Sequence, residues 1–99
     1  MSYIIDFPRI PSCDEVRLMT DDGFVAFKNR FYKYCDKAIA VTAVLTCDLP
    51  YGIEKDTKRA IDIVISHYRD SVAVAYDVVD WAIRVKYMGY REEFRHEDR

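Results

Sequence analysis

Apolar residues recur every three or four positions along two long stretches of the chain. In the first stretch, a single apolar seam comprises Phe24, Phe27, Phe31, Tyr34, Ala38, Val41 and Leu45. This spacing keeps the side chains on one face of a helix. Thr20, Asp21 and Asp22 precede the seam and supply the capping oxygens and negative charge that favour a helix start. The pattern therefore predicts a helix that reaches Cys47.

The second stretch, Asp56 to Met88, contains no Gly or Pro and carries two neighbouring apolar seams. The first seam comprises Ile61, Ile65, Tyr68, Val72, Ala75, Val79 and Ala82, and the second comprises Ala60, Val64, His67, Ser71, Val74, Val78, Trp81, Val85 and Met88. An apolar face this broad is wider than one partner helix would cover. We expect the excess to meet the N-terminal residues or a second copy of the chain.

Two other interpretations of this second stretch remain open. Residues 61–65 and 72–78 also alternate and are rich in β-branched side chains, which favour strands. A strand rarely exceeds about ten residues, however, and this stretch has no turn signal within it. One long helix is therefore favoured over two consecutive helices, which would be divided between Tyr68 and Ser71, and over strands.

Turn signals organise the rest of the chain. Residues 48–52 contain Pro50 and Gly52 and predict the turn between two antiparallel helices, and Gly89 predicts the end of the second helix. Residues 2–7 suit an extended segment, which the following prolines stop. Ser12, with Glu15 three residues later, predicts a short helix that runs to residue 19.

These elements predict a mainly α protein with a single domain over residues 1–90. Its centre would be an antiparallel helical hairpin, braced by the N-terminal extended segment and the short helix. An α+β fold with a small sheet is the alternative. Residues 91–99 are mostly charged and predict a flexible tail.

Composition narrows the classes of function. The chain has 99 residues and a net charge of −2 spread over both halves, so no global field attracts it to nucleic acid or anionic lipid.

No apolar run is long enough to span a membrane, and the N-terminus does not resemble a signal peptide, so we expect a cytoplasmic protein. Cys13, Cys35 and Cys47 form no CxxC pair, which predicts reduced, buried thiols, with a Cys13–Cys47 bridge left open.

Two groups of residues are candidate binding sites. A basic stripe with aromatic neighbours, comprising Lys28, Arg30, Tyr32, Lys33 and Lys37, could contact phosphates and stack on a base. The simpler interpretation of this stripe is a solvated helix face. A second group of tyrosines falls outside the core seams and suits a protein interface, where Tyr is enriched; it comprises Tyr51, Tyr76, Tyr87 and Tyr90.

Catalytic and metal-binding patterns have little support. The chain lacks G-x-S-x-G, H-E-x-x-H and a glycine-rich phosphate loop. His67 lies on an apolar seam and is interpreted as a hydrogen-bonded core histidine. Glu92 and His96 could share a metal, but two ligands hold a metal poorly. We expect no catalytic residue, no metal site and no cofactor.

In overall character the chain resembles the short proteins of crenarchaeal filamentous viruses, the lipothrixviruses and rudiviruses. It shares with them a length near one hundred residues, a single Asn29 and no Gln, many Tyr and Arg, and a compact N-terminal segment over residues 1–7. The resemblance implies a thermostable protein in the cytoplasm of a hot-dwelling host, with a role in replication, assembly or host takeover.

Together these observations favour a non-enzymatic protein-interaction module whose partner is unidentified. A nucleic-acid-binding accessory protein that uses the stripe between Lys28 and Lys37 is the alternative. We also expect a homodimer, because the broad apolar face of the second helix exceeds what one partner helix can cover.

Overall fold

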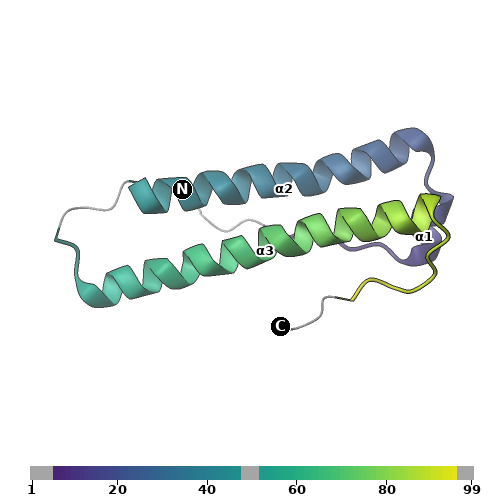
Figure 1. Cartoon of the computed structure of the whole chain (residues 1–99). Coiled ribbons are helices and arrows are strands. Elements are labelled where there is room, and N and C mark those ends of the chain that lie inside the picture. The colour runs from purple at the N-terminus through teal and green to yellow at the C-terminus, as the bar shows by residue number, and fades with distance from the viewer. Residues whose placement is uncertain (1–5, 48–51, 96–99) are drawn as a thin grey trace.

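The computed structural model describes residues 6–47 and 52–95, and this part of the chain forms three helices. They are α1 (Cys13–Leu18), α2 (Asp21–Cys47) and α3 (Lys55–Tyr87). Figure 1 shows α2 and α3 side by side and antiparallel, with α1 at the end of the hairpin where α2 begins and α3 ends. The predicted mainly α class and helical hairpin are thus confirmed, and the described residues contain no strand.

The aromatic half of the α2 seam forms the centre of the core. Phe24, Phe27 and Phe31 are fully buried, and the rings of Phe27 and Phe31 meet edge to face at 5.1 Å. The same seam is only half-buried at Val41 and Leu45, nearer the end of α2. The core is therefore concentrated at the α1 end of the hairpin, and of the described elements only α2 and α3 form the other end.

Helix α3 is continuous through residues 68–71, where a division into two helices was the alternative. Ser71 does not cap a second helix, because its hydroxyl donates a hydrogen bond to the carbonyl of His67 at 2.9 Å within the same helix. The helix ends as predicted before Gly89, which adopts a φ of 71°. The Tyr90 N–H then donates to the Arg84 carbonyl at 3.2 Å, and the same carbonyl also accepts from the Met88 N–H at 2.9 Å.

The left-handed conformation of Gly89 leads to a stability prediction. A side chain with a Cβ atom pays roughly 1–2 kcal/mol in this region, whereas Asn tolerates it better. We expect Gly89→Ala to lower the free energy of unfolding by about 1 kcal/mol in a urea titration, and Gly89→Asn to lower it less. Equal losses for the two variants would show that this conformation is not what the glycine supplies.

Helix α1 is fastened at both of its ends. The Ser12 hydroxyl accepts a hydrogen bond from the Glu15 N–H at 3.2 Å, which confirms the predicted cap. Val16 is fully buried against the core. At the other end, the Lys86 ammonium donates to the carbonyl of Met19 at 2.7 Å and so ties the end of α1 to α3.

The second seam of α3 is covered along only part of its length. Its later residues Val78, Trp81 and Val85 are buried where α1 and the C-terminal segment pack, whereas Val64 and His67 nearer the start of α3 are exposed. The interpretation of His67 as a core histidine is therefore wrong. Its position belongs to the apolar pattern, but no described residue covers it.

The first residues of the C-terminal segment, where a flexible tail is predicted from residue 91 onward, make specific contacts with the core. The Trp81 indole N–H donates to the carbonyl of Glu92 at 2.8 Å, and the Phe94 ring meets the Trp81 ring at 5.8 Å. The carboxylate of Glu93 accepts from the Cys13 N–H at 2.9 Å. Residues 91–94 therefore belong to the packed domain.

The N-terminal brace is seen through Phe7, whose ring lies 5.7 Å from Phe31 and 5.0 Å from Tyr34. Of the rest of the predicted extended segment, Asp6 is described and residues 2–5 lie outside the described part. Residues 48–51 of the predicted turn lie outside it too, and Gly52 has a φ of 81°.

The three thiols follow the prediction only in part. All three cysteines are free, so the alternative of a Cys13–Cys47 bridge is not formed. Cys13 and Cys35 are buried as predicted, but Cys47 is exposed. Cys47 is the last residue of α2 and lies at the two-helix end of the hairpin, where little covers the helices.

Candidate functional site

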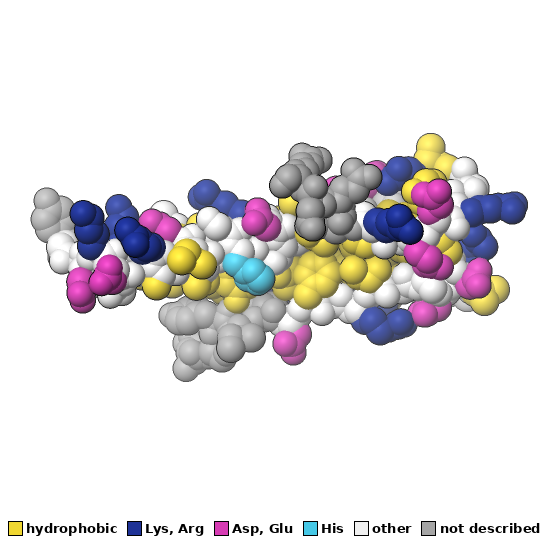
Figure 2. All heavy atoms as spheres, turned by 90° about the horizontal axis from the view of Figure 1, so that it is seen from below, with side chains coloured by type: hydrophobic (Ala, Val, Ile, Leu, Met, Phe, Trp, Pro, Cys, Tyr) yellow, Lys and Arg dark blue, Asp and Glu magenta, His cyan; other side chains and the backbone are white. Residues whose placement is uncertain are grey.

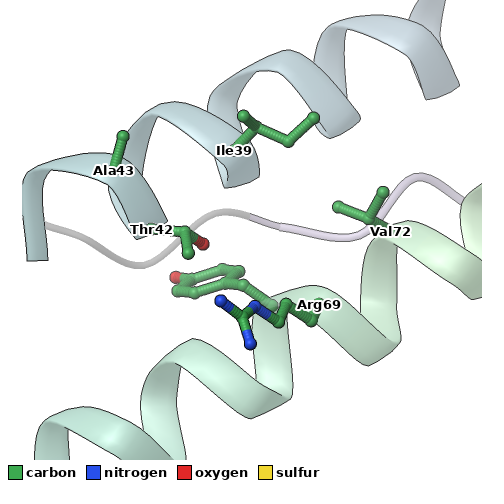
Figure 3. Close-up of a pocket in the computed structure, with 6 residues that line it drawn as sticks. Ile39, Thr42, Ala43, Arg69 and Val72 are labelled. Carbon is green, nitrogen blue, oxygen red and sulfur yellow. The ribbon is translucent and has the colours of Figure 1, made fainter. Parts of the chain in front are cut away.

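An open, mainly apolar groove lies between α2 and α3. It has a volume of about 350 Å³ and is lined by Ile39, Thr42 and Ala43 of α2 and by Tyr68, Arg69 and Val72 of α3. Figure 3 shows these residues on neighbouring stretches of the two helices, with Thr42 lying between them. The Thr42 hydroxyl donates to the carbonyl of Ala38 at 2.8 Å, so its own helix satisfies it. Arg69 is the one charged side chain in this lining.

Two exposed tyrosines border the groove on the side of the α1 end. The rings of Tyr32 and Tyr76 lie 6.4 Å apart, and these residues are 40% and 49% exposed. Tyr32 precedes Ile39 by seven residues, and Tyr76 follows Arg69 by seven. Seven residues make two helical turns, so each tyrosine shares a face with its groove neighbour. We call the groove and this tyrosine pair together the groove face.

The segments that complete the core pack on other parts of the hairpin. Trp81, which holds the C-terminal segment, lies five residues after Tyr76 and so about 140° around α3. Phe7, on the segment that leads into α1, packs against Phe31 and Tyr34 on the core side of α2. Of the described segments, α1 and residues 91–95 therefore pack on other sides of the hairpin and leave the groove face uncovered.

The predicted interface tyrosines are dispersed. Tyr76 lies on the groove face, and Tyr87 is 63% exposed on the same side of α3, three turns further along, with its ring edge-on to Phe24 at 5.7 Å. Tyr90 is half-buried and its hydroxyl contacts the Glu92 carboxylate at 3.1 Å, a hydrogen bond that raises the pKa of the tyrosine. Tyr51 lies outside the described residues.

The predicted basic stripe is divided by the rotation of α2. Arg30, Lys33 and Lys37 are exposed on one side, and none of them belongs to the ion pairs formed among the described residues. Lys28 lies on another side with its ammonium 5.2 Å from the centre of the Phe24 ring. Tyr32 belongs to the groove face, and it also lines an open hollow on α2 together with Arg30 and Lys33.

The surroundings of the two buried thiols, Cys13 and Cys35, change their pKa and so their ability to act as nucleophiles. Burial raises the pKa of Cys13, and the charge of the nearby Glu93 raises it further. Burial is also the main cause of the raised pKa of Cys35. A reactive cysteine needs the opposite shift, because the thiolate is the nucleophile.

Figure 2 views the molecule from the α3 side, where hydrophobic side chains run along the middle of the surface between charged residues. Exposed apolar residues near the start of α3 include Ile63 and Val64, which are 65% and 39% exposed. The side of α3 that carries Ile63 faces away from the groove, since Ile63 precedes Arg69 by six residues, or about 240° of helix rotation. The surface around Ile63 is therefore distinct from the groove face.

Within residues 6–47 and 52–95, no three His, Cys, Asp or Glu side chains come together as a metal site would require. His96, which was considered with Glu92 as a metal pair, lies outside these residues. None of the helices in the same part of the chain combines the length and apolar character needed to cross a bilayer.

Comparisons with protein-family models, curated proteins and solved structures found no match to this chain. The resemblance to crenarchaeal viral proteins therefore stays a prediction.

Proposed function

We propose that this protein is a non-enzymatic interaction module that binds a protein through the groove face. The observation that carries the proposal is the open groove bordered by the exposed Tyr32–Tyr76 pair. Tyr and Arg are enriched at the energetically important centres of protein interfaces. The groove face offers both, together with an apolar floor.

The exposure of the side chains on this face makes binding favourable. Ile39 and Tyr76 are 53% and 49% exposed, although each lies beside buried core residues. Complete burial of a large apolar side chain is worth about 1.5–3 kcal/mol, so covering these half-exposed residues would contribute part of that each. The raised pKa of Cys13 and Cys35 supports a role outside nucleophilic catalysis.

Photo-crosslinking tests the proposal. The photoreactive amino acid benzoylphenylalanine is placed at Tyr76, and in a control variant at Ile63, which is even more exposed and lies on the other side of the hairpin. We expect irradiation in an extract of the source cells to give a protein adduct from position 76 and much less from position 63. No adduct from position 76, or equal adducts from both positions, would contradict the proposal.

A second candidate function is nucleic-acid binding by Arg30, Lys33 and Lys37. It is favoured by the exposure of three cations that no described carboxylate pairs with. If these residues contact phosphates, fluorescence anisotropy with labelled oligonucleotides should show affinity that falls as salt rises, because each contact releases counterions. The variant Arg30→Glu, Lys33→Glu should abolish that binding. Unchanged binding in this variant would exclude the stripe.

The resemblance to crenarchaeal viral proteins supports the further proposal that the module acts in the cytoplasm of a hot-dwelling host. The absence of Gln and the single Asn29 support a thermostable protein, since both amides are thermolabile.

A further inference from the structure

We propose that the occupant of the groove face is a second copy of this chain. A two-fold axis would set the Tyr32–Tyr76 pair of each copy into the groove of the other. This inference rests on the proposed function, because it names the partner of the same face.

The groove face has the shape that a two-fold interface needs. In such an interface one patch meets itself, so every ridge must find a matching hollow elsewhere on the same patch. Here the ridge is the exposed tyrosine pair, and the hollow is the 350 Å³ groove beside the short side chains of Thr42 and Ala43. A second copy covers both.

The positions of ridge and hollow along the hairpin favour extensive overlap. In α2, Tyr32 and the groove residues 39–43 lie on either side of the middle of the helix. In α3, Tyr76 follows the middle of the helix and the groove residues 68–72 lie around it. The two-fold axis would lie halfway between the tyrosine pair and the groove. This point is within two or three residues of the middle of each helix, which is a distance of roughly 4 Å along the helix. The two copies would therefore overlap along nearly their whole length.

The size of the face is sufficient for a stable dimer. The chain measures 53 × 29 × 17 Å, and the groove lies between the two long helices. A standard interface buries about 800 Å² on each partner, which a hairpin of this length and width can supply. The product would be a four-helix bundle. Arg69 at the edge of each groove would then lie near the tyrosine rings of the other copy, a favourable contact for a guanidinium.

Sedimentation velocity between 1 and 100 µM tests the inference with a matched pair of variants. We expect the wild-type chain to sediment at twice its mass of 11.7 kDa. Ile39→Asp places a charge in the groove and should weaken association at least 100-fold. Ile63→Asp, an equal change at an exposed position away from the groove, should remain dimeric. Ala43→Trp, which fills the hollow without adding charge, should also yield monomers with unchanged helix content by circular dichroism.

The outcomes separate this inference from the proposed function. A wild-type monomer at 100 µM, or a dimer that survives both Ile39→Asp and Ala43→Trp, would overturn the inference. If the monomer still crosslinks to a different protein from position 76, the groove face binds a foreign partner and the proposed function stands. If the monomer gives no adduct from position 76, both fail. In a dimer, mass spectrometry should find the adduct from position 76 within residues 39–43 or 68–72 of the other copy.

Discussion

Replacing Phe31 by Ala is expected to lower the free energy of unfolding by about 3–5 kcal/mol, the usual cost of removing a buried aromatic ring. Phe31 is fully buried, and its ring contacts Phe27 at 5.1 Å and Phe7 at 5.7 Å. The substitution leaves a cavity between α2 and the N-terminal brace, at the place where the core is densest in aromatic rings. A urea titration monitored by circular dichroism measures the loss.

The control for this prediction is Leu18→Ala. Leu18 is an apolar side chain of similar size, but it is 84% exposed at the end of α1. We expect its substitution to change the free energy of unfolding by no more than about 0.5 kcal/mol. Protein concentration must be the same in every titration, because association would add to the apparent stability. Similar losses for Phe31→Ala and Leu18→Ala would contradict the position assigned to the aromatic core.

The helical hairpin could be predicted from the sequence because its information is local. The three-and-four spacing from Phe24 to Ala38 describes one helix face, and these residues are buried as that spacing predicts. The end of α3 is local in the same sense, since Gly89 alone permits the φ of 71° at which the chain turns. Both features follow from the chain within a few residues on either side.

The division of the second α3 seam could not be predicted in this way. The pattern marks Val64, His67, Val78 and Trp81 as equivalent, yet only the last two are buried. Their burial depends on α1 and on a C-terminal segment that returns to Trp81 through the Glu92 carbonyl. A periodic pattern identifies the apolar face of a helix, and it does not identify which other segment of the chain covers that face.

One feature of the candidate site could have been predicted from the sequence, and another could not. The separation of Lys28 from the other cations of the stripe could have been predicted from spacing, because Arg30, Lys33 and Lys37 are three and four apart and Lys28 is not in that series. The groove had no such signal. It depends on the register between α2 and α3, which places Ala43 opposite Tyr68 and Arg69, and register between two helices is a tertiary property.

The second large effect is expected at Trp81, which holds the C-terminal segment. Trp81→Ala should lower the free energy of unfolding by about 3–5 kcal/mol, because the ring is buried and packs against Phe94. Trp81→Phe keeps most of the ring and removes only the indole N–H that donates to Glu92 at 2.8 Å. Its expected cost is about 1 kcal/mol plus any loss from the smaller ring. Urea titrations of the two variants measure both losses.

The thiol of Cys13 reports whether the effect is local. It donates to the Glu92 carbonyl at 3.0 Å, and burial together with Glu93 raises its pKa. If Trp81→Phe loosens the segment, the pKa of Cys13 should fall toward its ordinary value, more thiolate should be present, and the thiol should react faster with an aromatic disulfide reagent. Exposed Cys47 should react at once in every variant, and buried Cys35 should stay slow. Equal acceleration of Cys13 and Cys35 would instead mean that the whole domain opens, and that residues 91–94 do not detach from the core independently.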